Sequence, residues 1–279
     1  MLRRSLTLSL AGACAGRGLG APPSPGPPPR WEIAEQSALV PPDAAPSRFD
    51  PSGVAVRDGE LFVVSDKPGW RGLHRVGPAV GGRRPLIPEP DPGGPWPADA
   101  EGLAWCGDRW QIADEAGALW ELRPGSPAAL GASPLPPGAD AWGNAGLEGV
   151  ACAPDGRVWM AKERDPPGLW SLEAGGARAL APPADAISDL HFADGRLWAL
   201  AREARALLEL DPATGVERGR EALPLDEAAW TTTHEPYGMA EGLIVDEDGL
   251  WLVLDVNEHG LKAEGGAPWG LLLRLRRPG

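Results

Sequence analysis

The sequence has few of the residues on which several common functional sites depend. It contains 3 cysteines and 4 histidines and has no His-Glu-x-x-His motif, so nothing in it indicates a zinc site. It also has no Gly-x-Ser-x-Gly motif and no phosphate-binding loop, which argues against a serine hydrolase mechanism. Basic residues are scarce as well: 26 Lys and Arg against 39 Asp and Glu give a net charge of −13. A broad basic face for nucleic acid is therefore not expected.

Turn-forming residues, by contrast, are abundant. The chain has 38 Gly and 33 Pro, yet 43% of its residues are hydrophobic. This combination of frequent turns with enough apolar residues for a core is typical of a domain of many short strands rather than of a disordered chain.

The N-terminus has the layout of an export signal. Arg3 and Arg4 precede a short apolar run, Leu6 to Ala15, which is too short to span a bilayer. We predict a signal peptide over residues 1–15, a Pro-rich tether over 16–30 and the folded domain over 31–279. The segment that ends at Cys14 resembles a bacterial lipobox, so two destinations stay open: a soluble periplasmic protein, or an outer-envelope lipoprotein anchored at Cys14.

The other two cysteines are Cys106 and Cys152. The alternation of side chains along their strands predicts that they face opposite ways in different parts of the fold. We therefore expect two buried thiols rather than a disulfide.

Five segments of the chain share one pattern. Each begins with a pair of small or acidic residues, continues with a short apolar strand and a turn, and ends with a second strand that carries an aromatic residue and finishes on a charged one. The segments are 52–66, 101–115, 148–163, 188–203 and 241–255, and their aromatic residues are Phe62, Trp110, Trp159, Trp198 and Trp251. A third strand and a weaker fourth strand follow each pair.

A period of this length with four short strands predicts an all-β, five-bladed β-propeller. The last segment stops after its third strand, and residues 31–40 form a spare strand before the first segment. We expect this N-terminal strand to close the last blade, which would remove exposed sheet edges. A two-sheet sandwich, the alternative, explains neither the repeat nor the displaced strand.

Acidic residues gather at one predicted face of the propeller. The start of each first strand and the end of each second strand should lie at the same end of the central channel. The expected inner ring is Ser52, Glu101, Glu148, Asp189 and Glu241, and the outer ring is Asp66, Asp114, Glu115, Glu163, Glu203, Asp255 and Asn257. Such carboxylates repel one another unless they are protonated or hold a cation.

Oxygen-only ligands favour a hard ion, with Ca²⁺ ahead of Mg²⁺. The predicted metal ligands are Glu101, Glu148, Asp189, Glu241 and Asp255. The alternative is that each acid only caps nearby backbone amides at the start of its strand.

Cationic residues stand beside some of these acids, in Lys162-Glu163-Arg164 and in Arg202-Glu203, and could hold an anionic group that bridges to the metal. We predict that Glu148, Glu163, Arg164 and Lys162 are catalytic, with a carboxylate as the base and Arg164 or Lys162 holding an anionic group. Surface ion pairs without a function are the alternative. His191, His234, Tyr237 and His259 are further candidates near this face.

These blocks resemble a known family. Asp99-Ala100-Glu101-Gly102, residues 144–150 with Lys162-Glu163-Arg164, Ile187-Ser188-Asp189-Leu190, and Ala240-Glu241-Gly242 with Asp255-Val256-Asn257 are similar to the phytase-like domain, also called "esterase-like activity of phytase". The fold also resembles the SdiA-regulated propellers. The phytase-like resemblance implies an exported bacterial propeller and suggests ester or phosphoester hydrolysis, although Val256 stands where that family commonly has Asp.

Two functions of different classes follow. The first is a monomeric, metal-dependent hydrolase of a small ester or phosphoester, in which a Ca²⁺-type ion activates the substrate and a water. The second is a non-enzymatic envelope module that binds a ligand or protein and holds a structural ion. Fold resemblance alone does not choose between them.

Overall fold

The computed structural model describes residues 30–42, 48–90, 95–124, 129–130, 136, 138, 142, 145–174, 176–233 and 238–278. The predicted signal peptide, most of the predicted tether, Cys14, His234 and Tyr237 lie outside these residues. Among the described residues, no helix is long and apolar enough to cross a bilayer.

Three antiparallel sheets of four strands each follow the predicted repeat. The first contains β6 (Ala100–Trp105), β7 (Trp110–Asp114), β8 (Ala118–Leu122) and β9 (Ala129–Leu130). The second contains β10 (Leu147–Cys152), β11 (Val158–Lys162), β12 (Gly168–Glu173) and β13 (Gly176–Ala179). The third contains β14 (Asp189–Ala193), β15 (Arg196–Ala201), β16 (Ala206–Leu210) and β17 (Glu217–Ala222).

The fourth sheet has eight strands, in the order β18-β19-β20-β1-β5-β4-β3-β2. Its members are β18 (Ala240–Asp246), β19 (Gly249–Leu254), β20 (Leu271–Arg276), β1 (Glu32–Val40), β5 (Arg83–Pro88), β4 (His74–Val76), β3 (Glu60–Ser65) and β2 (Pro51–Arg57). One short helix, α1 (Glu227–Trp230), and short 3-10 turns lie in the connections.

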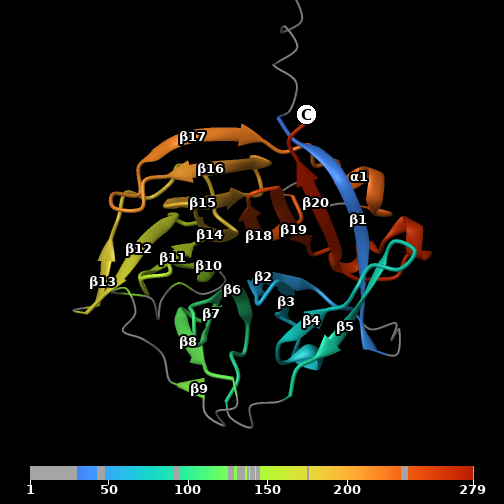
Figure 1. Ribbon diagram of the computed structural model, residues 1–279, viewed down its shortest axis with the longest axis horizontal. Helices are drawn as coiled ribbons and strands as arrows, with labels where there is room; N and C mark the ends of the chain where they lie inside the picture. Colours follow the sequence, from blue (N-terminus) through green and yellow to red (C-terminus); the bar gives the residue numbers. More distant parts are fainter. Residues whose placement is uncertain are drawn as a thin grey trace, which may run out of the picture.

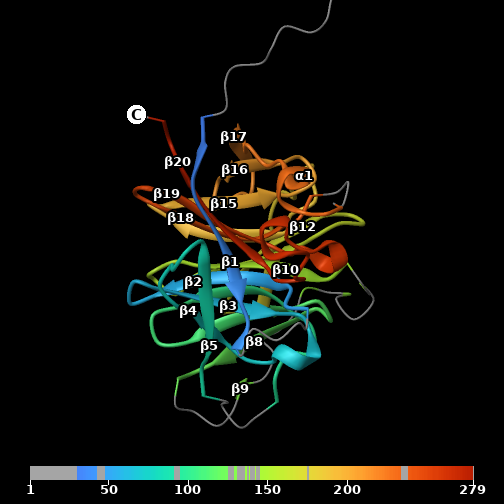
Figure 2. The ribbon, with the colours of Figure 1, turned by 90° about the vertical axis from the view of Figure 1, so that its right-hand side faces the viewer.

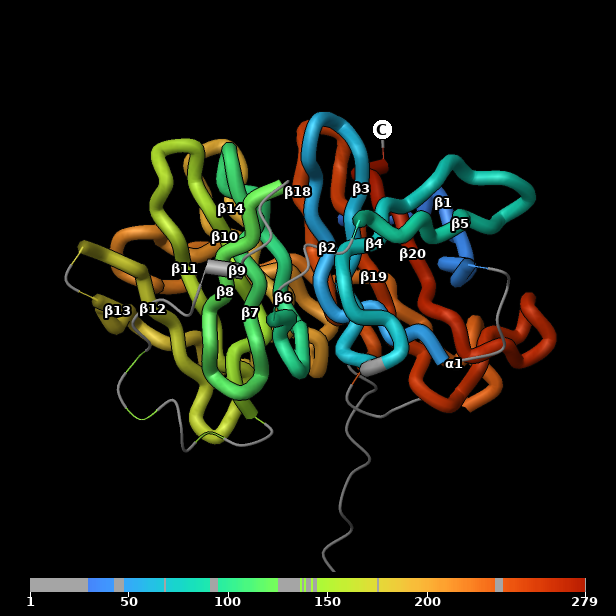
Figure 3. Tube along the Cα trace, turned by 90° about the horizontal axis from the view of Figure 1, so that it is seen from below, coloured from blue at the N-terminus to red at the C-terminus, as the bar shows by residue number. Residues whose placement is uncertain are grey.

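Strand β1, near the N-terminus, lies beside β20, near the C-terminus, as Figures 1 and 2 show. It pairs antiparallel with β20, for example Ala38 with Leu271, which confirms that the N-terminal strand completes the last set of strands. Its other edge pairs parallel with β5, where Ala38 lies opposite Arg83 (Figure 3). The sequence did not predict this second pairing, and because of it the structure has four sheets instead of five separate ones.

The innermost strands form a closed ring. β2 contacts β6, β6 contacts β10, β10 contacts β14, β14 contacts β18, and β18 contacts β2. Figure 1 looks down this ring, with these strands nearest its centre. The starts of the inner strands therefore converge, and the architecture is that of a β-propeller.

The repeated aromatic residues pack between neighbouring sheets. Phe62 and Trp110 lie in one apolar cluster with their ring centroids 5.0 Å apart, and Trp159 and Trp198 are buried in two other clusters. The fifth, Trp251, is only half-buried. Its ring lies 5.4 Å from the Arg84 guanidinium and 4.9 Å from that of Arg274, next to the β1–β5 junction.

Cys106 and Cys152 form a disulfide, so the prediction of two buried thiols was wrong. Cys106 follows β6, Cys152 ends β10, and their Cα atoms are 5.6 Å apart. Cys106 lies one residue beyond the end of β6, in the turn to β7, where the alternation of side chains that the prediction assumed no longer applies. The disulfide links two neighbouring inner strands.

Candidate cation-binding site

A cavity of about 220 Å³ lies where the starts of the inner strands converge, and each described side chain that lines it is polar or charged. Its lining residues are Ser52, Asp66, Lys67, Asp99, Glu101, Glu115, Glu148, Glu163, Arg164, Arg202, Glu241, Asp255 and Asn257. Eight of them are carboxylates and three are cations. The two predicted rings of acids therefore do meet at one face, although not all of their members reach the cavity.

Beta-bulges aim the inner residues into this cavity. The strand pairs β2–β3, β6–β7, β10–β11 and β18–β19 all shift register at the first residues of the inner strand. Ser52, Glu101, Glu148 and Glu241 lie at these shifts. A bulge leaves a residue out of the regular pairing and redirects its side chain, so these four residues can point along the channel.

The glycine after each of these residues lets the inner strands approach closely. A Cβ atom at Gly102 would lie 2.3 Å from the Glu148 carbonyl oxygen, and one at Gly53 would lie 2.5 Å from the Glu101 carbonyl oxygen. Real Cβ atoms do not come this near, so the glycine is required by the packing of neighbouring strands.

Asp189 departs from this arrangement. The pairing of β14 with β15 begins at Asp189 and is regular from there, and Asp189 occupies the position that a glycine has elsewhere. Its carboxylate is fully buried and accepts hydrogen bonds from the backbone N–H groups of Leu190 (2.8 Å) and Leu243 (2.7 Å). Asp189 thus joins neighbouring inner strands and does not line the cavity with the other acids.

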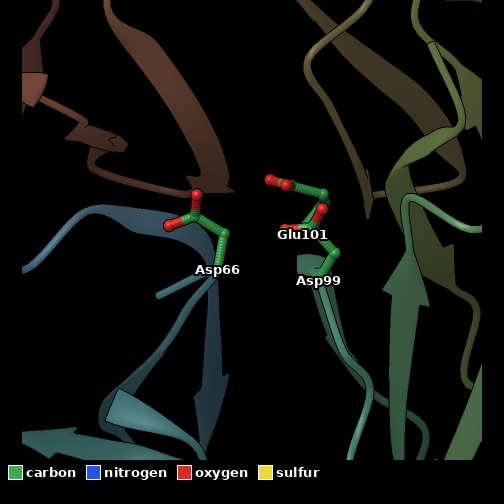
Figure 4. A group of neighbouring side chains, drawn as sticks. All are labelled: Asp66, Asp99 and Glu101. Carbon is green, nitrogen blue, oxygen red and sulfur yellow. The ribbon is translucent and has the colours of Figure 1, made fainter. Parts of the chain in front are cut away.

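Three carboxylates form a compact group at one side of the cavity (Figure 4). Asp66 follows β3, whereas Asp99 precedes β6 and Glu101 lies within it. One oxygen atom from each of the three lies within 4.8 Å of the others. A Ca²⁺ ion with ligands at about 2.3–2.6 Å brings oxygen atoms to such separations.

Burial and mutual repulsion raise the pKa values of the inner glutamates. The pKa of Glu101 lies well above its usual value because the group is buried and because Asp66 and Glu241 are near. The pKa of Glu148 is raised well above its usual value by burial and then by Glu101 and Glu241. Glu148 is 6% exposed and has no hydrogen bond or ion pair with another described residue.

Burial and neighbouring acids also raise the pKa values of two carboxyl groups of the outer ring. Burial, followed by the neighbouring Asp50, raises the pKa of Asp255 to about 9. Burial and the nearby Asp99 raise the pKa of Glu115 to about 7. A cation among these groups would favour their ionised forms and so relieve the cost of gathering them.

The three cations of the cavity are paired with particular acids. Lys67 pairs with Asp66 and, at 3.0 Å, with Asp50. Arg164 pairs with Glu163. Arg202 pairs with both Glu163 and Glu241. All are charge-assisted contacts at the rim or wall of the cavity.

Some predicted residues lie elsewhere. Lys162 does not line the cavity: its Nζ donates to the backbone oxygens of Arg164 and Pro166 and lies 5.7 Å from the Trp142 ring centroid. Asp114 accepts a hydrogen bond from Trp120 Nε1, and Glu203 is exposed.

Two predicted histidines also lie outside the cavity. His191 lines a separate cavity with Val245 and Asp246, which are at the far end of β18. Burial lowers its pKa to about 4. His259 contacts Thr233 in a connection.

Asp99 and Lys67 were not predicted as site residues, whereas Arg202 was noted only as a cation beside Glu203. Asp99 belongs to the Asp-x-Glu-Gly block that supported the family resemblance. The repeat alone gave no clear signal for Lys67, because the other segments have different residues at its position.

Comparisons with known proteins agree with this architecture. Residues 132–257 match the model of the SdiA-regulated family. That range includes Glu148, Glu163, Arg164, Arg202 and Glu241, and it confirms the resemblance to SdiA-regulated propellers. The phytase-like resemblance stays a prediction.

Solved structures give the fold but no activity. A glutaminyl cyclase from Myxococcus xanthus is similar to this chain at 18% identity and a TM-score of 0.52, over 89% of this chain and 97% of that one. A PQQ-bound aldose sugar dehydrogenase from Streptomyces coelicolor has 16% identity and a TM-score of 0.47, over 92% and 100% of the two chains. No curated protein matches the sequence significantly.

Proposed function

We propose that the cavity binds a divalent cation and that the protein is a metal-dependent hydrolase of an ester or phosphoester. The observation that carries this proposal is the group of Asp66, Asp99 and Glu101, whose oxygen atoms converge within 4.8 Å in a cavity that also contains cations. All of these donors are oxygen atoms, which suits Ca²⁺ better than Zn²⁺. Ca²⁺ also tolerates irregular coordination better than Mg²⁺.

The predicted ligands fit this site in part. Glu101 belongs to the compact group, while Glu148, Glu241 and Asp255 line the same cavity and add negative charge around it. Asp189 is engaged with backbone N–H groups and is the weakest candidate of the predicted set.

The chain's own residues have distinct roles in the proposed reaction. A bound ion would polarise an ester or phosphoryl oxygen. Arg164, at the rim and 35% exposed, would hold an anionic part of the substrate. Glu148 would accept the proton of the attacking water, since no described residue donates a hydrogen bond to its carboxylate and a nearby cation would keep it ionised.

One observation favours the alternative of a ligand-binding module with a structural ion. Arg164 and Arg202 are already paired with Glu163 and Glu241, and so some of the positive charge is used inside the protein. In that case the cation would only reduce repulsion among the acids.

We extend the proposal to location and architecture. The Cys106–Cys152 disulfide supports an exported protein, because disulfides persist in oxidising compartments. The ring of β2, β6, β10, β14 and β18 supports five blades, with the eight-stranded sheet counted as two blades joined by the β1–β5 pairing. Periplasmic and lipoprotein forms and a monomeric state remain part of the proposal.

The test is hydrolysis of p-nitrophenyl acetate and p-nitrophenyl phosphate by the full chain, with Ca²⁺ and after EGTA treatment. We expect turnover with Ca²⁺ on one of the two substrates, loss of turnover in EGTA, and a decrease of at least ~100-fold in Asp99→Asn. Asp108→Asn, a change at an exposed acid outside the cavity, is the matched control and should keep full activity. Binding of Ca²⁺ without hydrolysis of either substrate would favour the structural-ion alternative.

A further inference from the structure

Arg202 lies among carboxylates that come from different sheets. It follows β15, and its two terminal nitrogen atoms pair separately with Glu163, which follows β11, and with Glu241, at the start of β18. The Arg202 side chain is 18% exposed. The charges of Glu241 and Glu148 raise its pKa above the usual value, so the guanidinium stays charged throughout the accessible pH range.

The carboxylates around this one guanidinium carry more negative charge than it can neutralise. Glu163 is 1% exposed and Glu148 is 6% exposed. Among the described residues, one buried oxygen of Glu241 has no hydrogen-bond partner, and Glu148 has neither a hydrogen bond nor an ion pair. The second oxygen of Glu163 pairs with Arg164. Three acids thus share the two positive charges of Arg202 and Arg164, whereas buried charges are normally paired and hydrogen-bonded one to one.

We propose that Arg202 fills a second cation position of the channel, framed by Glu148, Glu163 and Glu241. This inference rests on the proposed ion at Asp66, Asp99 and Glu101 only for the number of ions in the parent protein. Three carboxylates and added water satisfy the coordination that Ca²⁺ prefers, and the guanidinium stands in the place of that ion. The parent chain therefore holds one divalent ion, and removal of the Arg202 charge creates room and ligands for another.

Counting bound ions tests this directly. Ca²⁺ binding to the full chain is measured by isothermal titration calorimetry and by equilibrium dialysis, for the parent, Arg202→Met, Arg202→Lys and Arg164→Met. We expect one ion per chain in the parent and two in Arg202→Met, because Met keeps an unbranched apolar stem but lacks the charged guanidinium and so leaves room for an ion. Arg202→Lys keeps the positive charge and should bind one. Arg164→Met is the matched control: it removes a cation from the same cavity but leaves Arg202 in place, and should bind one.

Adding a second change identifies the ligands. Arg202→Met combined with Glu148→Gln should bind one ion again, or a second ion at least ~10-fold more weakly, since one of its three carboxylates is gone. If Arg202→Met does not fold in EGTA, it is refolded in Ca²⁺, and circular dichroism should then show recovery of the native spectrum. A chain that stays unfolded in saturating Ca²⁺ would refute the proposal.

The outcomes separate this inference from the proposed function. One ion in both the parent and Arg202→Met, or two ions in the parent, would overturn the second position and leave the hydrolase proposal untouched. No ion in the parent and one in Arg202→Met would support the second position, but would show that Asp66, Asp99 and Glu101 do not hold an ion.

Discussion

Glu148 is a buried carboxyl that lowers the stability of the fold but could bind a cation. Its carboxylate is buried, its pKa is raised by burial and by the acids around it, and no described residue donates to it. Such a group lowers stability unless a proton or a cation is present. The residue is therefore better explained by what it binds than by what it contributes to the fold.

Replacement of Glu148 tests this balance. Without metal, Glu148→Gln should be no less stable than the parent, because the amide resembles the protonated acid and removes the repulsion with Glu101 and Glu241. Urea unfolding in EGTA measures the difference, and Glu247→Gln, at an exposed acid away from the cavity, should change nothing. A loss of several kcal/mol in the metal-free Glu148→Gln variant would mean that this carboxylate supports the fold.

Trp198 represents the opposite kind of residue, one that serves packing. It is 7% exposed and lies in the apolar cluster that joins β15 and the last set of strands. Trp198→Ala should cost about 3–5 kcal/mol in the free energy of unfolding, whereas Val216→Ala, at a side chain that is 54% exposed, should cost little. Equal stabilities of the two variants would contradict the packing role.

Among the elements, the inner strands depend on their glycines. Gly102→Ala would place a methyl group 2.3 Å from the Glu148 carbonyl oxygen on the neighbouring strand. Because the contact is with backbone, we expect a loss of about 1–3 kcal/mol or more, measured by thermal unfolding. Gly69→Ala is the matched control, since nothing lies within 4 Å of its new Cβ atom. A Gly102→Ala variant as stable as the control would show that the strands are not held this close.

The sequence predicted most of the strands because each repeat has the same alternation and the same turns. It also predicted that β1 pairs with β20, since the last segment lacked a fourth strand. It did not predict the β1–β5 pairing. The free edge of β1 can pair with a strand of the next blade without any change in the pattern of apolar and polar residues along either strand.

The same reasoning explains which site residues were predicted. Glu101, Glu148 and Glu241 precede a glycine in the repeat, and the structure brings all three to the cavity. Asp189 was grouped with them although it occupies the glycine position, and the hydrogen bonds that it accepts from Leu190 and Leu243 show that its carboxylate turns to the backbone. The disulfide was missed because Cys106 lies in the turn after β6, where the alternation of a strand does not apply.

At the scale of the whole molecule, the excess of acids in one cavity should make stability depend on pH. Asp255 keeps its proton in the folded protein up to about pH 9, whereas in the unfolded chain it loses the proton near its usual pKa. The folded state thus binds more protons than the unfolded state between these values, and stability falls as pH rises towards 9. His74 and His191, whose pKa values are lowered to about 4, are largely uncharged in both states above about pH 7, so they add little to the change of stability between pH 7 and pH 9.

We therefore expect the metal-free protein to have a lower free energy of unfolding at pH 9 than at pH 7, by an amount on the order of 1–2 kcal/mol, and so to unfold at a lower temperature. Saturating Ca²⁺ should reduce this difference, because the ion favours the ionised carboxylates that high pH produces. Differential scanning calorimetry with and without EGTA measures both. Higher stability at pH 9 than at pH 7 without metal would contradict the proposed repulsion.

The most direct test of the central claim is the melting temperature of the full chain as Ca²⁺ is added to the metal-free protein. An ion that binds only the folded state stabilises it by about 2.7 kcal/mol at 100 times its Kd. We predict a rise in melting temperature that follows binding to a single site and is much smaller in Asp99→Asn, but unchanged in Asp108→Asn. A parent protein whose melting temperature does not respond to millimolar Ca²⁺ or Mg²⁺ would contradict the account, because the acids of the cavity would then not form a cation site.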